Sequence, residues 1–421
     1  MRALPALASL AFLSLSVSVF SLLRHPEAPP PPRPDPPPVV VTGLVDPQDV
    51  KPLPEYLDES LDWLAAAQFE SGGWGAGTHA AQHVTDPHAV QMDPATTAFA
   101  ALALMRAGST PARGPHAGNV RRALDYLVGL VEQVPADAPN ITTIRGTQPQ
   151  AKLGGNIDAA LAAQFFTATL PHVRGRMHAR VEAALDRCLE AIQDAQADDG
   201  SQAGGGWAPV LQSAMANSAL ERAQQAGRTV DQDALQRSRD YQRRNVTVGP
   251  GGAPASVDAS AGAGVALYAA TASQRATAQE ARAAAEAVRR TRGEEADVTV
   301  EALREAGRTG EEAERLFDAY TRNEATADLL AGDDIWSGFG NNGGEEFLSY
   351  MMTSESLVIA GGDAWDRWHA RLVNLFGSIQ NQDGSWSGHH CITSPVFNTA
   401  AVILALTADR DQTLLAHVIR G

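Results

Sequence analysis

The chain alternates between two kinds of apolar segment, and each kind predicts a different helix. The first kind carries its apolar residues along one stripe, as in residues 119–130, where Val120, Leu124 and Leu127 recur at helical spacing. The second kind is apolar nearly all round and rich in small residues, as in residues 93–108, where Ala dominates. A stripe predicts a surface helix, and all-round apolarity predicts burial on every side. The pattern therefore predicts pairs of one outer and one inner helix.

The pair occurs six times along the chain. Inner helices are predicted to begin near residues 93, 157, 210, 257, 345 and 394, at intervals of roughly 50 residues with one longer gap. Repeats of this size are typical of solenoids and closed arrays. Because the inner helices show little polar face, we expect an all-α fold, the (α/α)6 toroid or double ring of helices. An open superhelix is the alternative, and it would leave one face of each helix in water.

A Gln/Gly/Trp turn joins the helices of the first and last pairs, at Gln68–Trp74 and Gln380–Trp386. Glycine permits the positive φ that reverses the chain. The Trp ring is expected to fill the wedge between pairs and donate through its indole N–H. The Gln amide is suited to backbone groups freed at a helix end. These roles are structural and imply no catalysis.

This order of outer helix, turn and small-residue inner helix resembles the terpenoid cyclase and protein prenyltransferase superfamily. The turn is similar to the "QW" repeat of squalene-hopene and oxidosqualene cyclases, and the resemblance covers about residues 50–410. It implies a toroid and an apolar or isoprenoid-like ligand. The D-x-D-D acid motif of the cyclases is absent, and Cys391 is not part of a D-x-C zinc motif of the prenyltransferase kind, because His389 stands where the Asp would be. The resemblance therefore leaves open whether the protein is an enzyme.

The N-terminal region predicts export. Residues 1–25 contain the apolar run Ala3–Leu23, which indicates a signal peptide or a membrane anchor. Residues 26–48 form a Pro-rich linker, expected to be extended polyproline II. The toroid is expected over residues 49–421, either anchored to a membrane, which would be a partner through the N-terminal segment, or periplasmic or otherwise extracytoplasmic.

A charged insertion is predicted at about 274–334, where Arg, Glu and Asp are dense. The favoured interpretation is a solvated excursion of two or three exposed helices. A lid over the ring, or a hairpin that docks a protein partner, is the alternative.

Charge and cysteine content exclude some functions. The formal net charge is −16, which disfavours nucleic acid as a partner because such binding needs basic patches. Cys188 and Cys391 lie in different kinds of segment, and we expect two free thiols rather than a disulfide. No phosphate-binding P-loop and no G-x-S-x-G nucleophile motif is present.

Candidate chemistry is expected at one mouth of the ring, where loops meet the N-termini of the inner helices. A Cys beside imidazoles at a helix N-terminus suits a nucleophile or a zinc ligand. His390 and Cys391 are therefore candidate zinc ligands, completed by Glu345 or Glu346. In the alternative, Cys391 is a small buried residue and the histidines hydrogen-bond loop carbonyls. The acidic candidates at the same helix starts are Asp93, Asp158, Asp258, Glu345 and Glu346.

Glu355 stands on an otherwise apolar inner helix, where a carboxylate is costly unless it is paired or used. In the alternative to a functional role, Glu355 is paired with a neighbouring Ser, His or backbone group. Asp93 is better explained as a helix N-cap, and a metal site in the loop of His79, His83 and His88 is a weaker hypothesis. The candidate catalytic residues are thus Glu345, Glu346, Glu355, His389, His390 and Cys391.

Three functions remain open. The first is a toroid protein, related to cyclases and prenyltransferases, that binds or acts on an apolar or isoprenoid-like small molecule at the ring mouth. The second is a non-catalytic scaffold or binding protein that keeps the fold. The third is a polysaccharide-active (α/α)6 enzyme, for which paired carboxylates at the mouth would be expected.

Overall fold

The computed structural model describes residues 50–249, 255–333, 336, 339–361 and 363–411 of the chain. Helices dominate these residues, and their sheet content is one antiparallel hairpin of β1 (Val246–Thr247) and β2 (Ser256–Val257). The predicted all-α class is confirmed.

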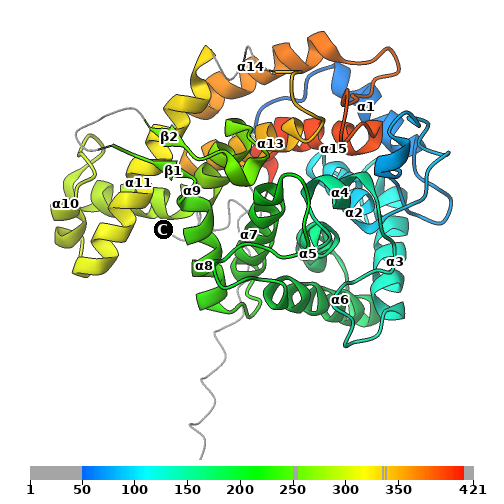
Figure 1. The fold of residues 1–421 in the computed structure, drawn as a ribbon, viewed down its shortest axis with the longest axis horizontal. Helices are drawn as coiled ribbons and strands as arrows, with labels where there is room; N and C mark the ends of the chain where they lie inside the picture. Colours follow the sequence, from blue (N-terminus) through cyan, green and yellow to red (C-terminus); the bar gives the residue numbers. More distant parts are fainter. Residues whose placement is uncertain (1–49, 250–254, 334–335, 337–338, 362, 412–421) are drawn as a thin grey trace, which may run out of the picture. The chain divides into compact units, whose positions relative to one another are not determined.

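Within the described residues, six buried helices form a ring. They are α2 (Pro94–Arg106), α5 (Ile157–Thr169), α7 (Pro209–Gln225), α9 (Ala266–Arg292), α13 (Glu346–Ala360) and α15 (Pro395–Leu406). Each packs against the next in chain order, and α15 packs against α2 (Figure 1). The last contact closes the ring, so the predicted toroid is confirmed and the open superhelix is excluded.

Outer helices lie against this ring. They are α1 (Tyr56–Ala66), α3 (Ala117–Gln133), α6 (Gly175–Asp194), α8 (Gln232–Arg243), α11 (Gly310–Ala331) and α14 (Ala364–Ile379). As predicted, α3 buries one stripe through Val120, Leu124 and Leu127, whereas α5 is buried along almost its whole length. Short elements lie between the helices: α4 (Gln148–Leu153), η1 (His79–Ala81), η2 (Leu170–His172), η4 (Ser260–Gly262) and η5 (Ala408–Arg410).

The Gln/Gly/Trp turns act as joints, as predicted. Trp74 and Trp386 are fully buried, and their indole N–H groups donate to the carbonyls of Leu64 and Phe376 at 2.8 and 3.0 Å. Gln68 Nε2 donates to the carbonyl of Gly72 at 2.7 Å, within the same turn. Each joint thus ties the end of an outer helix to the turn that follows it.

The fourth inner helix differs from its prediction. It was expected to begin near residue 257, but α9 begins at Ala266 and runs to Arg292, through the point where the insertion was expected to start. The segment before it pairs as a hairpin, and Ala263 between two glycines takes a left-handed φ of 56°. A left-handed residue cannot continue an α-helix, so the start is delayed.

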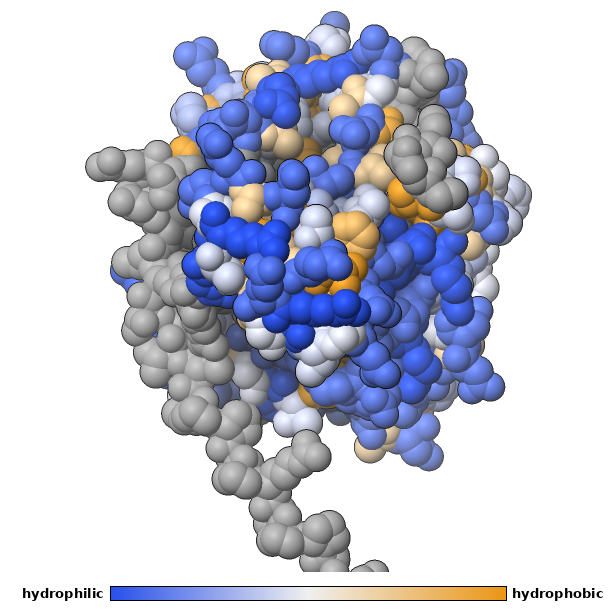
Figure 2. Space-filling view, turned by 90° about the vertical axis from the view of Figure 1, so that its left-hand side faces the viewer, coloured by the Kyte–Doolittle hydropathy of each residue, from blue (hydrophilic) through white to orange (hydrophobic). Residues whose placement is uncertain are grey.

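The charged segment forms part of the outer layer rather than a solvated excursion. The short helix α10 (Val300–Glu305) and α11 both pack on α9. A small apolar cluster that includes Val288, Leu303 and Leu316 holds the three helices together. Their charged side chains face outward, and the side of the molecule that carries α10 and α11 is largely hydrophilic (Figure 2).

The membrane prediction is corrected. Among the residues that the structure describes, no helix is both long enough and apolar enough to cross a bilayer. The apolar run Ala3–Leu23 and the Pro-rich linker lie outside the described residues. The proposed membrane partner therefore has no support and is not retained. Export stays a prediction from the sequence.

Candidate functional site

A buried carboxylate lies at the start of α13, where loops that precede several inner helices meet. Glu345 is 0% exposed, and its Oε1 accepts hydrogen bonds from Lys152 Nζ at 2.8 Å and from the Tyr268 hydroxyl at 2.8 Å. Lys152 lies in α4, just before α5, and Tyr268 lies in the first turn of α9. Three inner-helix starts thus converge on one carboxylate. We call Lys152, Tyr268, Glu345 and Cys391 the Glu345 centre.

Two glycines allow the loop before α13 to press against the loop before α15. A Cβ on Gly344 would lie 1.9 Å from the Ile392 carbonyl oxygen, and one on Gly343 would lie 2.8 Å from Cys391 Cβ. The Gly344 N–H donates to the His390 carbonyl at 3.2 Å. A side chain at either glycine would force the loops apart, so these residues bring Cys391 beside Glu345.

Cys391 belongs to this centre, as a protonated thiol rather than a thiolate. It is 8% exposed, and its backbone N–H donates to Gln82 Oε1 at 2.7 Å. Burial, and then the charge of Glu345, raise the pKa of the Cys391 thiol, and the hydrogen-bonded Lys152 ammonium opposes them without reversing the direction. A helix N-terminus and neighbouring imidazoles ordinarily lower the pKa of a thiol, but here burial and the carboxylate outweigh them.

The two histidines lie on the exposed surface over the centre. Their Nδ1 atoms are 2.7 Å apart, and both side chains face solvent. Partial burial, with the neighbouring His389, lowers the pKa of His390. Among the described residues no group of three or more His, Cys, Asp or Glu side chains is placed to hold a metal ion. The zinc hypotheses for His390 and Cys391 and for the His79–His88 loop are not retained.

An exposed aromatic ring stands at the rim of the same mouth. Trp207 is 64% exposed, and its ring centroid lies 6.0 Å from that of His79. Gln82, which binds the Cys391 backbone, also contacts His79 Nδ1 at 3.0 Å. The residue after Trp207, Ala208, donates its N–H to the Lys152 carbonyl at 2.8 Å. The rim and the Glu345 centre are therefore joined on two sides.

Sequence reasoning missed Lys152, Tyr268 and Trp207. One signal was available: the chain has two lysines, Lys51 and Lys152, among 33 basic residues, and Lys152 precedes a glycine pair in a buried segment. No comparable signal marked Tyr268, because a single Tyr in an apolar helix is normally a core residue.

Glu346 does not join the centre. Its carboxylate accepts hydrogen bonds from the Gly340 N–H at 2.8 Å and from Asn342 Nδ2 at 3.1 Å, within its own loop. Burial raises the pKa of Glu346 to about 7, although these hydrogen bonds oppose the rise. Its partners give it a loop-fixing role.

Glu355 lies far along α13 from Glu345, among buried arginines. Its Oε1 accepts from Arg106 and Arg222 at 2.6 and 2.7 Å, and its Oε2 accepts from Arg275 at 3.2 Å. Asp411 pairs with Arg106 and Arg222, each at 2.5 Å. Glu221 extends the cluster through Arg275 at 2.7 Å. We call these six residues the ionic plug. Because they pair with one another, Glu355 is a paired carboxylate, which was the alternative to a catalytic role.

The remaining acidic candidates have structural partners. Asp93 caps α2, where Oδ1 accepts from the Thr96 N–H at 2.8 Å, as predicted. Asp158 accepts from Gln150 Nε2 at 2.6 Å and from the Ala95 N–H at 3.2 Å. Burial, followed for Asp158 by the charge of Asp93, raises their pKa values to about 6 and about 7. Asp258 is exposed and accepts from the Ser260 N–H.

Comparison with known proteins yields little. No protein-family model and no curated protein matches the chain. One similar solved structure is an inactive variant of the alpha-1,6-mannanase GH76A of Salegentibacter sp. HEL1_6 in complex with alpha-1,6-mannotriose, at 9% identity and a TM-score of 0.47. The match covers 85% of this chain and 98% of that one. It carries no inference about substrate. The toroid implied by the cyclase resemblance is present, but membership of that superfamily is not supported.

Proposed function

We propose that the protein is a polysaccharide-active toroid enzyme, and that the Glu345 centre with the Trp207 rim binds the saccharide and carries out the chemistry. This was the third of the functions left open by the sequence. Two properties of the mouth favour it over the isoprenoid hypothesis: a buried carboxyl acceptor beneath the mouth and an exposed aromatic ring at its edge.

The carrying observation is the second oxygen of Glu345. Oε1 has two donors, but Oε2 is buried and has no hydrogen-bond partner among the described residues. A buried acceptor that lacks a hydrogen-bond donor typically costs about 1–3 kcal/mol of folding free energy, and a charged acceptor costs more. A sugar hydroxyl or a water molecule bound at Oε2 would supply the missing donor.

The chemistry follows from the protonation states. Glu345, whose Oε1 is held by Lys152 and Tyr268, can accept a proton at Oε2 from a water molecule or a sugar hydroxyl. Burial raises the pKa of Tyr268, and Glu345 adds to the shift, so this residue stays protonated. The Cys391 thiol is protonated for the same two reasons. The centre therefore combines one proton acceptor with two protonated groups that can hydrogen-bond to a sugar. In the proposed hydrolysis Glu345 takes one proton from the water molecule, the remaining hydroxide bonds to the sugar carbon as the glycosidic bond breaks, and Glu345 returns the proton to the departing sugar oxygen.

The ring interior argues against a polyprene. The ionic plug fills one part of it with charged side chains. The main aromatic cluster, which includes Phe347, Tyr350, Trp368 and Phe376, packs against itself between α13 and α14. Stabilising a polyprene cation needs several aromatic faces around the ligand. The described residues instead place paired ions in the ring.

The test is turnover of a panel of purified polysaccharides: mannan, β-glucan, xylan and polyuronate. Released ends would be measured by a reducing-sugar assay and unsaturated products by ultraviolet absorbance. We expect at least one polymer to be cleaved, and Glu345→Gln to lower the rate by about 100-fold or more. Tyr268→Phe, which keeps the ring and removes one donor, should lower kcat as well. Glu346→Gln is the matched control, since its partners lie within its own loop.

Thermal unfolding of each variant separates lost chemistry from lost folding. If Glu345→Gln unfolds below the assay temperature, Tyr268→Phe carries the test. Equal rates for wild type and a folded Tyr268→Phe or Glu345→Gln variant would remove the Glu345 centre from catalysis. Saccharide binding without cleavage of any polymer would instead favour the non-catalytic binding protein.

A further inference from the structure

We propose that a cleft outside the mouth, formed by the end of α1, the loop after η1 and the last Gln/Gly/Trp turn, is an additional saccharide-binding subsite. This inference rests on the proposed function and extends its binding surface beyond the Glu345 centre. Its predicted ligand is a neutral or amino-substituted sugar unit of a chain held at the mouth.

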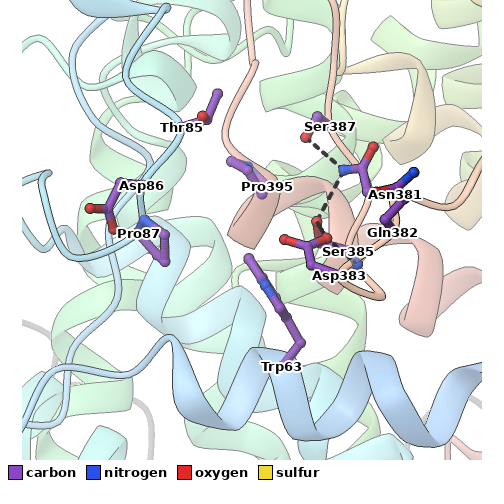
Figure 3. Close-up of a pocket in the computed structure, with 10 residues that line it drawn as sticks. All are labelled: Trp63, Thr85, Asp86, Pro87, Asn381, Gln382, Asp383, Ser385, Ser387 and Pro395. Atoms are coloured by element: carbon purple, nitrogen blue, oxygen red, sulfur yellow. Dashed lines mark hydrogen bonds between the residues drawn. The ribbon is translucent and has the colours of Figure 1, made fainter.

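The cleft has the size and floor of a sugar site. Its volume is about 570 Å³, within the range of roughly 300–1,000 Å³ found for small-molecule pockets. Trp63, which is partly exposed, extends from α1 into the space between Pro87 and Asp383, below Pro395 (Figure 3). An aromatic face flanked by prolines offers an apolar surface on which a sugar ring can stack.

Hydrogen-bonding groups line one side of the Trp63 floor. Asn381 Nδ2 donates to Ser385 Oγ and Ser387 Oγ, each at 3.0 Å, and Figure 3 shows these contacts beside Asp383. Asp383 Oδ1 accepts from the Ser385 N–H at 3.1 Å and from its hydroxyl at 2.6 Å. The turn is therefore held in place before any ligand binds, which reduces the entropy cost of binding.

The equivalent turn of the first pair shows that the joint does not need these polar groups. There, Phe69 and Gly75 stand where the last turn has Asn381 and Ser387. A Cβ on Gly75 would lie 2.0 Å from the Gln91 carbonyl oxygen, so that turn is covered by its own loop. In the last turn the same position is open and polar. An Asp-Gly-Ser turn with the same contacts also occurs at Asp199, so the Asp383 Oδ1 contacts belong to the turn and are not special to the cleft.

The charges of the cleft restrict the ligand. The described residues that line it include two carboxylates, Asp86 and Asp383, and no Lys or Arg. An anionic sugar such as a uronate would meet like charges, while hydroxyl and ammonium donors would meet acceptors. We therefore expect neutral or amino-substituted sugars rather than uronates.

The cleft is built from the same two segments as the mouth. Ser387 precedes Cys391 by four residues, and Pro395 follows it by four. Thr85 follows Gln82, whose Oε1 binds the Cys391 backbone at 2.7 Å. A saccharide chain that occupies the Glu345 centre could therefore continue into the cleft.

The test is affinity electrophoresis of the full chain in gels that contain mannan, β-glucan, xylan, chitosan or polyuronate. Trp63→Ala should weaken retardation by a neutral polymer or chitosan by about tenfold, as expected for loss of a stacking ring. Trp63→Phe should retain most of it. Asp383→Asn keeps the Oδ1 acceptor of the turn, so it removes charge without removing structure, and it should lessen discrimination against polyuronate.

Turnover of short oligosaccharides, measured in parallel, separates the two proposals. The subsite predicts unchanged turnover of a disaccharide by Trp63→Ala, together with weaker binding of polymers. Unchanged polymer retardation in a folded Trp63→Ala variant would overturn the subsite and leave the proposed function standing. Retardation that depends on Trp63, without any turnover, would overturn the proposed enzyme and keep the subsite. No retardation and no turnover with any polymer would overturn both.

Discussion

Replacing Glu355 by glutamine should destabilise the protein strongly, because this carboxylate holds three arginines of the ionic plug. The side chain is 1% exposed and lies 2.6, 2.7 and 3.2 Å from Arg106, Arg222 and Arg275. Glutamine has nearly the same shape but no charge. The change therefore leaves the arginine cations buried with only part of their counter-charge.

The magnitude follows by two routes, from the typical cost of breaking a buried ion pair and from the pKa of Glu355. Removing one partner of a buried ion pair typically costs about 3–5 kcal/mol. Burial alone would raise the pKa of Glu355, but Arg222, Arg106 and Arg275 outweigh it and lower this pKa from 4.5 to about 2. A shift of this size corresponds to about 3 kcal/mol of stability at neutral pH. Both routes predict a loss of about 3–5 kcal/mol in the free energy of unfolding.

The sign of the pH dependence follows from the lowered pKa. The stabilisation is fully present above about pH 4.5, the pKa in the unfolded chain, and is lost as the pH falls through the folded-state pKa of about 2. The difference between wild type and Glu355→Gln should therefore be constant above pH 5 and shrink below pH 4.5.

Urea unfolding followed by circular dichroism at several pH values is the assay. Glu132→Gln is the control, because Glu132 pairs with Arg180 at 2.7 Å on the exposed surface and should contribute less than about 1 kcal/mol. A loss below 1 kcal/mol for Glu355→Gln, or a difference independent of pH down to pH 2, would show that the plug does not stabilise the ring as argued.

Two further predictions concern the joint and the acid pair. Trp386→Phe should lower the free energy of unfolding in urea by about 1–3 kcal/mol, because the Phe376 carbonyl loses the indole donor. Trp207→Phe at the exposed rim should change it by less than about 0.5 kcal/mol. Equal effects of the two substitutions would contradict the structural role of Trp386 in the joint. Burial raises the pKa of Asp158 from 3.8 to about 7. The wild-type protein therefore loses stability as the pH rises from about 4 to about 7, because the buried carboxyl group ionises in this interval. Asp158→Asn should therefore gain in melting temperature relative to wild type between pH 4 and pH 8, and a constant difference in calorimetry would refute the shift.

Several features could be predicted from the sequence because they depend on neighbours along the chain. Helical periodicity separated the striped outer helices from the all-round apolar inner ones. Asp93 before Pro94 marked the cap of α2, and the Gln/Gly/Trp spacing marked the joints around Trp74 and Trp386. The start of α9 was missed because the left-handed Ala263 and the short hairpin outweighed a locally apolar pattern.

The site depended on contacts that no local pattern contains. The sequence could mark Glu345 and Glu355 as costly carboxylates on a buried helix, but it could not tell which of the two has a structural role. Closure of the ring brings Lys152 and Tyr268 to Glu345, across 77 residues for the tyrosine, and brings three arginines to Glu355. Burial makes each charge require a partner. The sequence by itself therefore determined the helices and their joints. The tertiary structure decided which carboxylate is paired with arginines in the plug, and which keeps, among the residues that the structure describes, an oxygen without a hydrogen-bond partner at the mouth.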